Sequence, residues 1–406
     1  MSKIFKLKGA VQNYAWGGND FIPDLLGIEK EPKTYAEYWL GAHVNAPAKV
    51  LTDEGEERLD EFIQRNSTEV LGVKVAKEFG RLPYLFKVLD VKDMLSIQVH
   101  PTKPEAEKGF AKENELGIPL TAPNRNYKDD NHKPEIMVAL GEFWLLHGFL
   151  TPSKLLKTLK EVPEFNHLIA VFDEEKHDYF SLYQKVMEET DEITESTLRS
   201  LIKRVLPQYT AGKLDKENPD YWAAMAVSAA GESAKIDKGI YSIYFFNLMK
   251  VNKGEAVFQD AGIPHAYLEG QNMELMANSD NVLRAGLTPK HVDVPELLKH
   301  VDFKGIVPNI LTGQTSIDGS LETMYDSPVR DFVLSQITLG KGDSYHHDSK
   351  TAEILMVMDG DVAVFDAEKE VLNARKGEAL LVVADCSYNL TAEEGSIIYK
   401  ASALLN

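Results

Sequence analysis

The feature that most constrains the fold of this chain is a change from strand-like to helix-like sequence and back again. Residues 1 to about 150 contain short β-rich runs, such as residues 95–100 and 136–140. A stretch rich in Leu, Lys, Glu and Ala then runs from a helix-start signal at residues 151–153 to about residue 234. Strand-like sequence resumes at Tyr241. This order predicts a mainly β protein with one helical insertion.

The strands are short, numerous and separated by glycine turns, which is typical of barrels and sandwiches rather than of a parallel α/β sheet. We therefore expect cupin-like (jelly-roll) β-barrels in two related modules. No glycine-rich phosphate loop follows a strand, which argues against a nucleotide enzyme. The predicted domains are a discontinuous cupin-like catalytic domain at 1–150 and 236–325, a helical insertion domain at 151–235, and a C-terminal cupin-like β domain without a metal site at 326–406.

Composition limits the compartment and the partners. The net charge of −19 argues against nucleic acid, whose phosphates would be repelled. No apolar run approaches the roughly 20 residues that span a bilayer, and the first residues lack a signal-peptide pattern. The single cysteine, Cys386, excludes an intramolecular disulfide and a cysteine-based zinc site. We expect a cytoplasmic monomer without a membrane partner.

Gln98 and His100 are the first candidate metal ligands. Alternate residues of a strand point to the same face, so both side chains can reach one ion. Taken alone, a histidine on a strand is more often a buried residue with satisfied hydrogen bonds. The pair gains weight only from further ligands elsewhere in the chain.

Glu135 and His265 are those further ligands. Pro134 favours extended backbone before Glu135, which precedes the apolar run 136–140 and is expected to face an interior. A buried carboxylate is normally paired, hydrogen-bonded or metal-bound, and a salt bridge to Lys133 is the alternative. His265 ends a Gly-x-Pro-His motif at the mouth of a predicted barrel. One amide oxygen, two imidazoles and one carboxylate suit Zn²⁺ with room for water or substrate.

A long polar segment at residues 265–290 carries the strongest functional signal. Turn chemistry around residues 278–281 is its structural alternative. The segment resembles the long signature of the type I phosphomannose isomerases. Other parts of the chain fit the same family, namely Tyr127-Lys-Asp-Asp-Asn-His-Lys-Pro-Glu135, Tyr14-Ala-Trp16-Gly17, Ala36-Glu37 with Gly41-Ala42-His43, and Gln98-Val-His100-Pro101. The resemblance covers residues 10–150 and 240–305, whereas the insertion and the C-terminal module match in placement only.

The resemblance implies a zinc-dependent aldose–ketose isomerase of mannose metabolism that interconverts mannose 6-phosphate and fructose 6-phosphate. It implies one Zn²⁺ per chain, held by Gln98, His100, Glu135 and His265. It also implies further site residues, which we divide into a catalytic group of Arg284, Lys133, His132, Asp280 and Glu274 and a substrate-binding group of Trp16, Lys87, Ser96 and Lys290.

Isomerisation moves a proton between C1 and C2, usually through a cis-enediol, and needs a base and an electrophile near the two oxygens. We expect Arg284 to stabilise the enediolate and His132 or Asp280 to assist ring opening. The carbon base is open among Glu274, Asp280 and Lys133. Against the net charge of −19, the phosphate needs local cations. The best placed are Lys87, Lys133, Arg284 and Lys290.

Two other functions fit parts of the pattern. Redox iron sites use two histidines and a carboxylate, so an oxygenase is one alternative, although Gln98 and the basic residues favour a redox-silent metal. A non-catalytic sugar-phosphate sensor is the other, although it would not need acid–base groups. In the C-terminal module, His346, His347 and Glu353 faintly resemble a first cupin metal motif. No Gly-x-Pro-His follows them, so we expect a duplicated fold without a metal.

Overall fold

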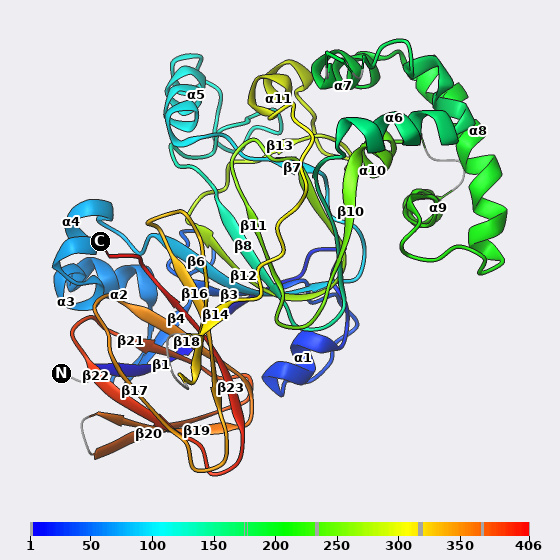
Figure 1. Cartoon of the computed structure of the whole chain (residues 1–406). Helices are drawn as coiled ribbons and strands as arrows, with labels where there is room; N and C mark the ends of the chain where they lie inside the picture. The colour runs from blue at the N-terminus through cyan, green and yellow to red at the C-terminus, as the bar shows by residue number, and fades with distance from the viewer. Residues whose placement is uncertain are drawn as a thin grey trace.

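The computed structural model describes residues 3–173, 175–176, 178–231, 235–315, 320–366 and 369–405. These residues form three hydrogen-bonded sheets and a set of helices. Figure 1 shows the helices from the middle of the chain (green) at one end of the molecule and the C-terminal strands (orange to red) at the other. The prediction of a strand-rich protein with a helical insertion is confirmed. The described residues form no closed barrel.

The first sheet has ten strands among the described residues and is organised around β12 (His265–Ala277). Its start pairs with β9 and β7, and its second half pairs with β6 and β8. The other strands of this sheet are β2 (Ala10–Gln12), β3 (Glu37–Gly41), β6 (Tyr84–Val91), β7 (Gln98–Val99), β8 (Glu135–Ala139), β9 (Phe143–Phe149), β10 (Phe246–Val251), β11 (Ala256–Gln259) and β13 (Leu283–Arg284).

Gly270 marks the place where β12 changes partners. Its φ of +126° is a conformation that residues with a side chain rarely adopt, and a Cβ there would lie 2.6 Å from the carbonyl oxygen of Glu142. The pairing register with β9 shifts just before this glycine, between Tyr267 and Glu269. One long strand therefore pairs with β9 and β7 at its start and with β6 and β8 in its second half. This arrangement brings His265 beside β7.

The second sheet joins the two ends of the chain. The N-terminal strand β1 (Ile4–Lys8) lies between β4 and β21, so the start of the chain is hydrogen-bonded to C-terminal strands. The other strands are β4 (Lys49–Thr52), β5 (Gly55–Arg58), β14 (Gln314–Thr315), β15 (Glu322–Tyr325), β16 (Val333–Leu339), β18 (Glu353–Asp359), β21 (Ala379–Val382) and β23 (Ser396–Ser402). The third sheet contains β17 (Ser344–Asp348), β19 (Asp361–Asp366), β20 (Lys369–Arg375) and β22 (Ser387–Thr391).

Helices fill the region where the sequence predicts an insertion. They are α6 (Pro152–Glu161), the 3-10 helix η1 (Pro163–Leu168), α7 (Tyr179–Glu188), α8 (Asp191–Thr210) and α9 (Pro219–Ala230). Residues 232–234, at the predicted end of this stretch, lie outside the described part of the chain. The remaining helices are α1 (Phe21–Leu26), α2 (Leu59–Arg65), α3 (Ser67–Leu71), α4 (Val73–Phe79), α5 (Lys103–Glu115), α10 (Gly239–Phe245) and α11 (Val294–His300).

The prediction that strand structure resumes at Tyr241 is wrong, because α10 continues to Phe245 and β10 begins at Phe246. Every residue of α10 is buried. A run that is apolar on all sides has no period with which to distinguish a helix from a strand. In the folded protein this buried run forms a short helix.

The insertion shares a hydrophobic core with the central sheet. Phe149 on β9 is fully buried, and its ring contacts Tyr183 on α7 and Phe246 on β10 at centroid distances of 5.3 and 4.9 Å. The same core includes Ile97 and Val99 beside the candidate ligand Gln98. Packing of the helices therefore supports the strand that carries a candidate site residue.

Candidate metal centre and active site

Three of the four predicted metal ligands converge at one buried point. Glu135 at the start of β8 extends one carboxylate oxygen to 3.5 Å from Nε2 of His100 and the other to 3.3 Å from Nε2 of His265. The candidate ligand atoms of these residues all lie within 4.8 Å of one another. Gln98, the fourth predicted ligand, lines the same small pocket as Glu135 and His265 and pairs directly with His265 across β7 and β12.

The ring nitrogens fit a bound cation. Nδ1 of His100 donates to the carbonyl oxygen of Asn281 at 2.9 Å, and Nδ1 of His265 donates to that of Ile263 at 2.9 Å. Both Nε2 atoms are buried and have no hydrogen-bond partner among the described residues. Burial, reinforced by the positive charge of Lys133, lowers the pKa of His100 to about 4, so this ring is neutral at pH 7. A lone pair facing a carboxylate is repulsive unless a cation lies between them, so the donor set fits a divalent metal.

Two lysines neutralise the buried carboxylates of this region. Nζ of Lys133 lies 2.8 Å from Glu135. Lys87 on β6 is opposite Glu274 on β12, and its Nζ lies 2.9 Å from Glu274 and 3.5 Å from Glu37. Burial alone would lower the pKa of Lys87, but the charges of Glu274 and Glu37 raise it above its usual value. Lys87 is therefore a buried cation shared by two carboxylates.

We expect Lys87→Met to lower the free energy of unfolding by about 3–5 kcal/mol, because it leaves buried carboxylates without their cation. Urea denaturation measures this change. Lys6→Met is the matched control, since Lys6 pairs with Glu378 at 2.9 Å with about a third of each side chain exposed. That change should cost about 1 kcal/mol or less. Equal losses in the two variants would contradict the importance assigned to the buried pair.

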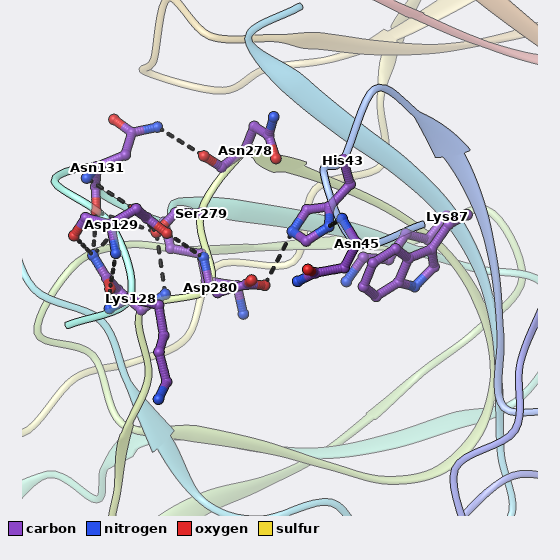
Figure 2. A network of polar contacts seen from close by, with 12 residues as sticks. His43, Asn45, Lys87, Lys128, Asp129, Asn131, Asn278, Ser279 and Asp280 are labelled. Atoms are coloured by element: carbon purple, nitrogen blue, oxygen red, sulfur yellow. Dashed lines mark hydrogen bonds and ion pairs between the residues drawn. The ribbon is translucent and has the colours of Figure 1, made fainter. Parts of the chain in front are cut away.

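The two predicted signature segments are hydrogen-bonded to each other (Figure 2). The carboxylate of Asp129 accepts from the hydroxyl of Ser279 at 2.8 Å and from the backbone N–H of Asp280 at 2.7 Å. The side-chain amide of Asn281 donates back to the carbonyl oxygens of Asp129 and Asn131. The turn-forming alternative for residues 278–281 is therefore correct for Ser279 and Asn281, which hold the loop in place.

Asp280 extends from this loop toward His43, whose Nε2 lies 3.2 Å from its carboxylate (Figure 2). Burial opposes ionisation of Asp280. The hydrogen bond with His43 and the positive charges of Lys133 and Lys87 nevertheless keep the pKa of this carboxyl below its usual value. The side chain is thus an ionised group beside an imidazole, which suits proton transfer to and from hydroxyl groups.

Arg284 lies next to the candidate ligands. On β13 it pairs directly with Gln98, which pairs with His265, so these three residues occupy adjacent positions across three strands. Its Nε is buried without a hydrogen-bond partner among the described residues. Burial lowers the pKa of Lys290 and of Lys128, and in each case the nearby charge of Arg284 lowers it further. The charge of Arg284 therefore acts on both lysines, while Nζ of Lys128 also donates to the carbonyl oxygen of Leu120 at 2.8 Å.

Three other predicted site residues, His132, Trp16 and Ser96, are not among those that line the small pocket. Nε2 of His132 is 3.0 Å from the carboxylate of Asp331, in the segment leading to β16. Trp16 lines a larger pocket of about 550 Å³ together with Met94, which precedes β7, and Met225 on α9 of the insertion. Ser96 is half-buried, two residues before Gln98. Their roles remain predictions.

Sequence reasoning did not assign Tyr267, Glu37 or Lys128 to the site. Tyr267 lines the small pocket, and its buried hydroxyl has no hydrogen-bond partner among the described residues. It lies two residues after His265 on the same strand, so the period of two could have identified it. Glu37 also lines the pocket, and it belongs to one of the motifs noted above. Lys128 belongs to another.

Comparison with known proteins gives the family. Residues 4–151 match the model of the phosphomannose isomerase type I catalytic domain. Mannose-6-phosphate isomerase of Escherichia coli (strain K12) is 38% identical over 94% of this chain and 95% of its own length. The Homo sapiens enzyme of that name is 34% identical over 99% of each chain. The chain belongs to the type I phosphomannose isomerase family.

The likeness within this family extends to the whole structure. A crystal structure of mannose 6-phosphate isomerase from Salmonella typhimurium, bound to substrate and to zinc, has 34% sequence identity and a TM-score of 0.87, with both chains fully covered. A structure of mannose 6-phosphate isomerase bound with zinc and yttrium has a TM-score of 0.86 with the same coverage. The resemblance found in the motifs is therefore confirmed over nearly the full length. No described helix is long and apolar enough to cross a membrane.

Proposed function

We propose that this chain is a zinc-dependent isomerase that interconverts mannose 6-phosphate and fructose 6-phosphate through a cis-enediol intermediate. The observation that carries the proposal is the convergence of His100, Glu135 and His265 beside Arg284, with two Nε2 atoms that have no hydrogen-bond partner among the described residues. In this proposal the three residues and Gln98 hold one Zn²⁺ per chain. The ion would orient and polarise the oxygens at C1 and C2 of the open-chain sugar.

Arg284 is proposed to stabilise negative charge on the enediolate, because its position next to Gln98 brings a guanidinium close to the ligand set. The phosphate is proposed to bind near Lys290 and Lys128. Lys87 and Lys133 are already paired with buried carboxylates. They are therefore less suited to hold the phosphate, and we assign them to charge balance of the site.

For the carbon base we favour Glu274 among the three candidates. Burial raises the pKa of its carboxyl, although the charge of Lys87 opposes this effect, and a carboxylate with a raised pKa is a better proton acceptor. It lines the same small pocket as Glu135 and His265. Glu274 would remove the proton from C2 of the aldose and return it to C1. Asp280 with His43 is proposed to move the hydroxyl proton during ring opening.

Finer aspects of the architecture are also proposals. We propose cupin-like (jelly-roll) modules with the predicted domain boundaries, supported by the antiparallel strands of all three sheets and by the insertion of α6–α9 between β9 and β10. We also propose a cytoplasmic monomer that takes a sugar phosphate as its small-molecule partner. The negative net charge of −19 supports the absence of a nucleic-acid partner.

The test is a coupled assay for fructose 6-phosphate formed from mannose 6-phosphate, with unphosphorylated mannose and glucose 6-phosphate as controls. We expect turnover of mannose 6-phosphate alone. The same preparation is examined for oxygen uptake, because two histidines and a carboxylate also match the ligand set of iron oxygenases. Binding of mannose 6-phosphate without turnover would indicate the sensor, and oxygen consumption would indicate the oxygenase.

The C-terminal module should hold no metal. His346 is hydrogen-bonded to Asn389 at 3.0 Å, and His347 to Glu353 at 3.0 Å. In the described residues, the one cluster suited to a metal is that of His100, Glu135 and His265. We expect the double variant His346→Ala with His347→Ala to keep the same zinc content and turnover. A second bound ion that disappears in this variant would contradict the prediction.

A further inference from the structure

Asp237 connects the end of the helical insertion to the loop that follows Arg284. Its Oδ1 accepts from the backbone N–H of Leu287 at 2.8 Å and from that of Gly239 at 2.6 Å. Its Oδ2 accepts from the N–H of Thr288 at 3.1 Å. One carboxylate therefore joins the start of α10 to two consecutive residues of the loop after β13. Hydrogen bonds to a charged group are stronger than those between neutral groups.

The loop needs such a contact because its backbone is unusual. Leu287 has a φ of +54°, a left-handed conformation that costs roughly 1–2 kcal/mol for a residue with a side chain. Gly286 approaches α10 so closely that a Cβ would lie 2.5 Å from the Cα of Gly239. On its other side, the carbonyl oxygen of Gly286 accepts from the N–H of Ile97 at 3.0 Å. The loop is thus held between α10 and the segment leading to β7.

This loop lies between two cationic side chains. Arg284 is at its start and Lys290 at its end, and neither forms an ion pair with a carboxylate in the described part of the chain. The Nε of Arg284 is buried and unpaired there. Since Asp237 directs its carboxylate to backbone N–H groups, it holds the loop without neutralising either side chain. Both remain available to an anion.

We propose that Asp237 is a positioning residue for the substrate phosphate: it fixes residues 285–290 so that Lys290, at the end of the loop, faces the phosphate while Arg284 stays beside Gln98. This inference rests on the proposed function and deepens it. It also gives the segment that ends the helical insertion a role in substrate binding. The geometry of the loop, rather than the charge of Asp237, would set affinity for the phosphoryl group.

The test compares Asp237→Ala with Asp237→Asn in the full chain. Removal of the carboxylate should raise KM for mannose 6-phosphate and the dissociation constant of inorganic phosphate by about tenfold, with kcat changed by about twofold or less. An amide oxygen can still accept from Gly239 and Leu287, so Asp237→Asn should lie between wild type and Asp237→Ala. Asp178→Asn is the matched control, because Asp178 caps α7 through the N–H of Ser181 and lies outside the proposed site. Asp178→Asn should leave KM, kcat and the dissociation constant of inorganic phosphate unchanged.

Phosphate binding is measured directly by calorimetry on the metal-loaded protein, so it does not depend on turnover. A wild-type protein that binds phosphate tenfold more tightly than Asp237→Ala supports the inference even if mannose 6-phosphate is not isomerised. Equal phosphate affinity in wild type and Asp237→Asn and Asp237→Ala would overturn it. A fall in kcat with unchanged KM would also overturn it, because the loop would then act on the chemical step. If Asp237→Ala does not fold, the test rests on the phosphate affinity and the KM of Asp237→Asn, each compared with the wild-type value.

Discussion

Replacing Glu135 with glutamine is expected to remove the bound metal and to lower isomerase turnover by about 10³-fold or more. The carboxylate is the one anionic member of the proposed ligand set, and it lies 3.3–3.5 Å from the two imidazole nitrogens. Loss of metal removes several kcal/mol of charge stabilisation, and each 1.36 kcal/mol is a factor of about ten in rate. Zinc content by elemental analysis and kcat from the coupled assay measure the two effects.

The control for this variant is Glu353→Gln. Glu353 is as buried as Glu135 and is also bonded to a histidine, His347, but it lies in the C-terminal module. Any general cost of converting a buried carboxylate to an amide should appear in both variants. Zinc content and kcat should fall in Glu135→Gln and remain at the wild-type level in Glu353→Gln. Retention of full zinc and activity in Glu135→Gln would show that the ligand set is wrong.

Arg284→Ala should lower kcat by on the order of 10²–10³ and raise KM much less. Arg284 is next to Gln98 in the sheet, so its guanidinium is well placed to stabilise charge that develops on the substrate oxygens. Such a contact strengthens only as the enediolate forms, and therefore acts on kcat. Arg284→Lys keeps the charge but loses the planar fork, so it should recover only part of the rate.

The alternative is that Arg284 mainly grips the phosphate, which contributes equally to the ground state and the transition state. In that case KM would rise while kcat changed little. Lys290→Met provides the comparison, because Lys290 is assigned to the phosphate and should show this second pattern. Steady-state kinetics on mannose 6-phosphate separate the two patterns, with zinc content checked in each variant. If Arg284→Ala and Lys290→Met raised KM by the same factor and both retained kcat, the role given to Arg284 would be contradicted.

Residues with a local signal were predicted best. The alternation of Gln98 and His100, and the proline before Glu135, depend on neighbouring residues alone, and the structure brings His100, Glu135 and His265 together. The helical insertion was equally visible, because amphipathic helices such as α6 repeat over several turns.

Features that depend on distant residues were not predictable in this way. The contact of His132 with Asp331 joins parts of the chain far apart in sequence, and so does the pairing of β1 with β21. The strand expected at Tyr241 is a helix because burial on all sides removes the periodic signal. Likewise, the residues around Asp237 in the sequence do not indicate that its carboxylate accepts a hydrogen bond from Leu287, fifty residues later.

The most direct test of the central claim is a titration of zinc into rigorously metal-free protein, followed by turnover of mannose 6-phosphate. The account predicts negligible turnover at the start, a linear rise with added zinc, and a plateau at one zinc per chain. It also predicts that Glu135→Gln shows no rise over the same range of zinc. Full turnover in the metal-free protein, or no turnover at any zinc concentration, would contradict the account.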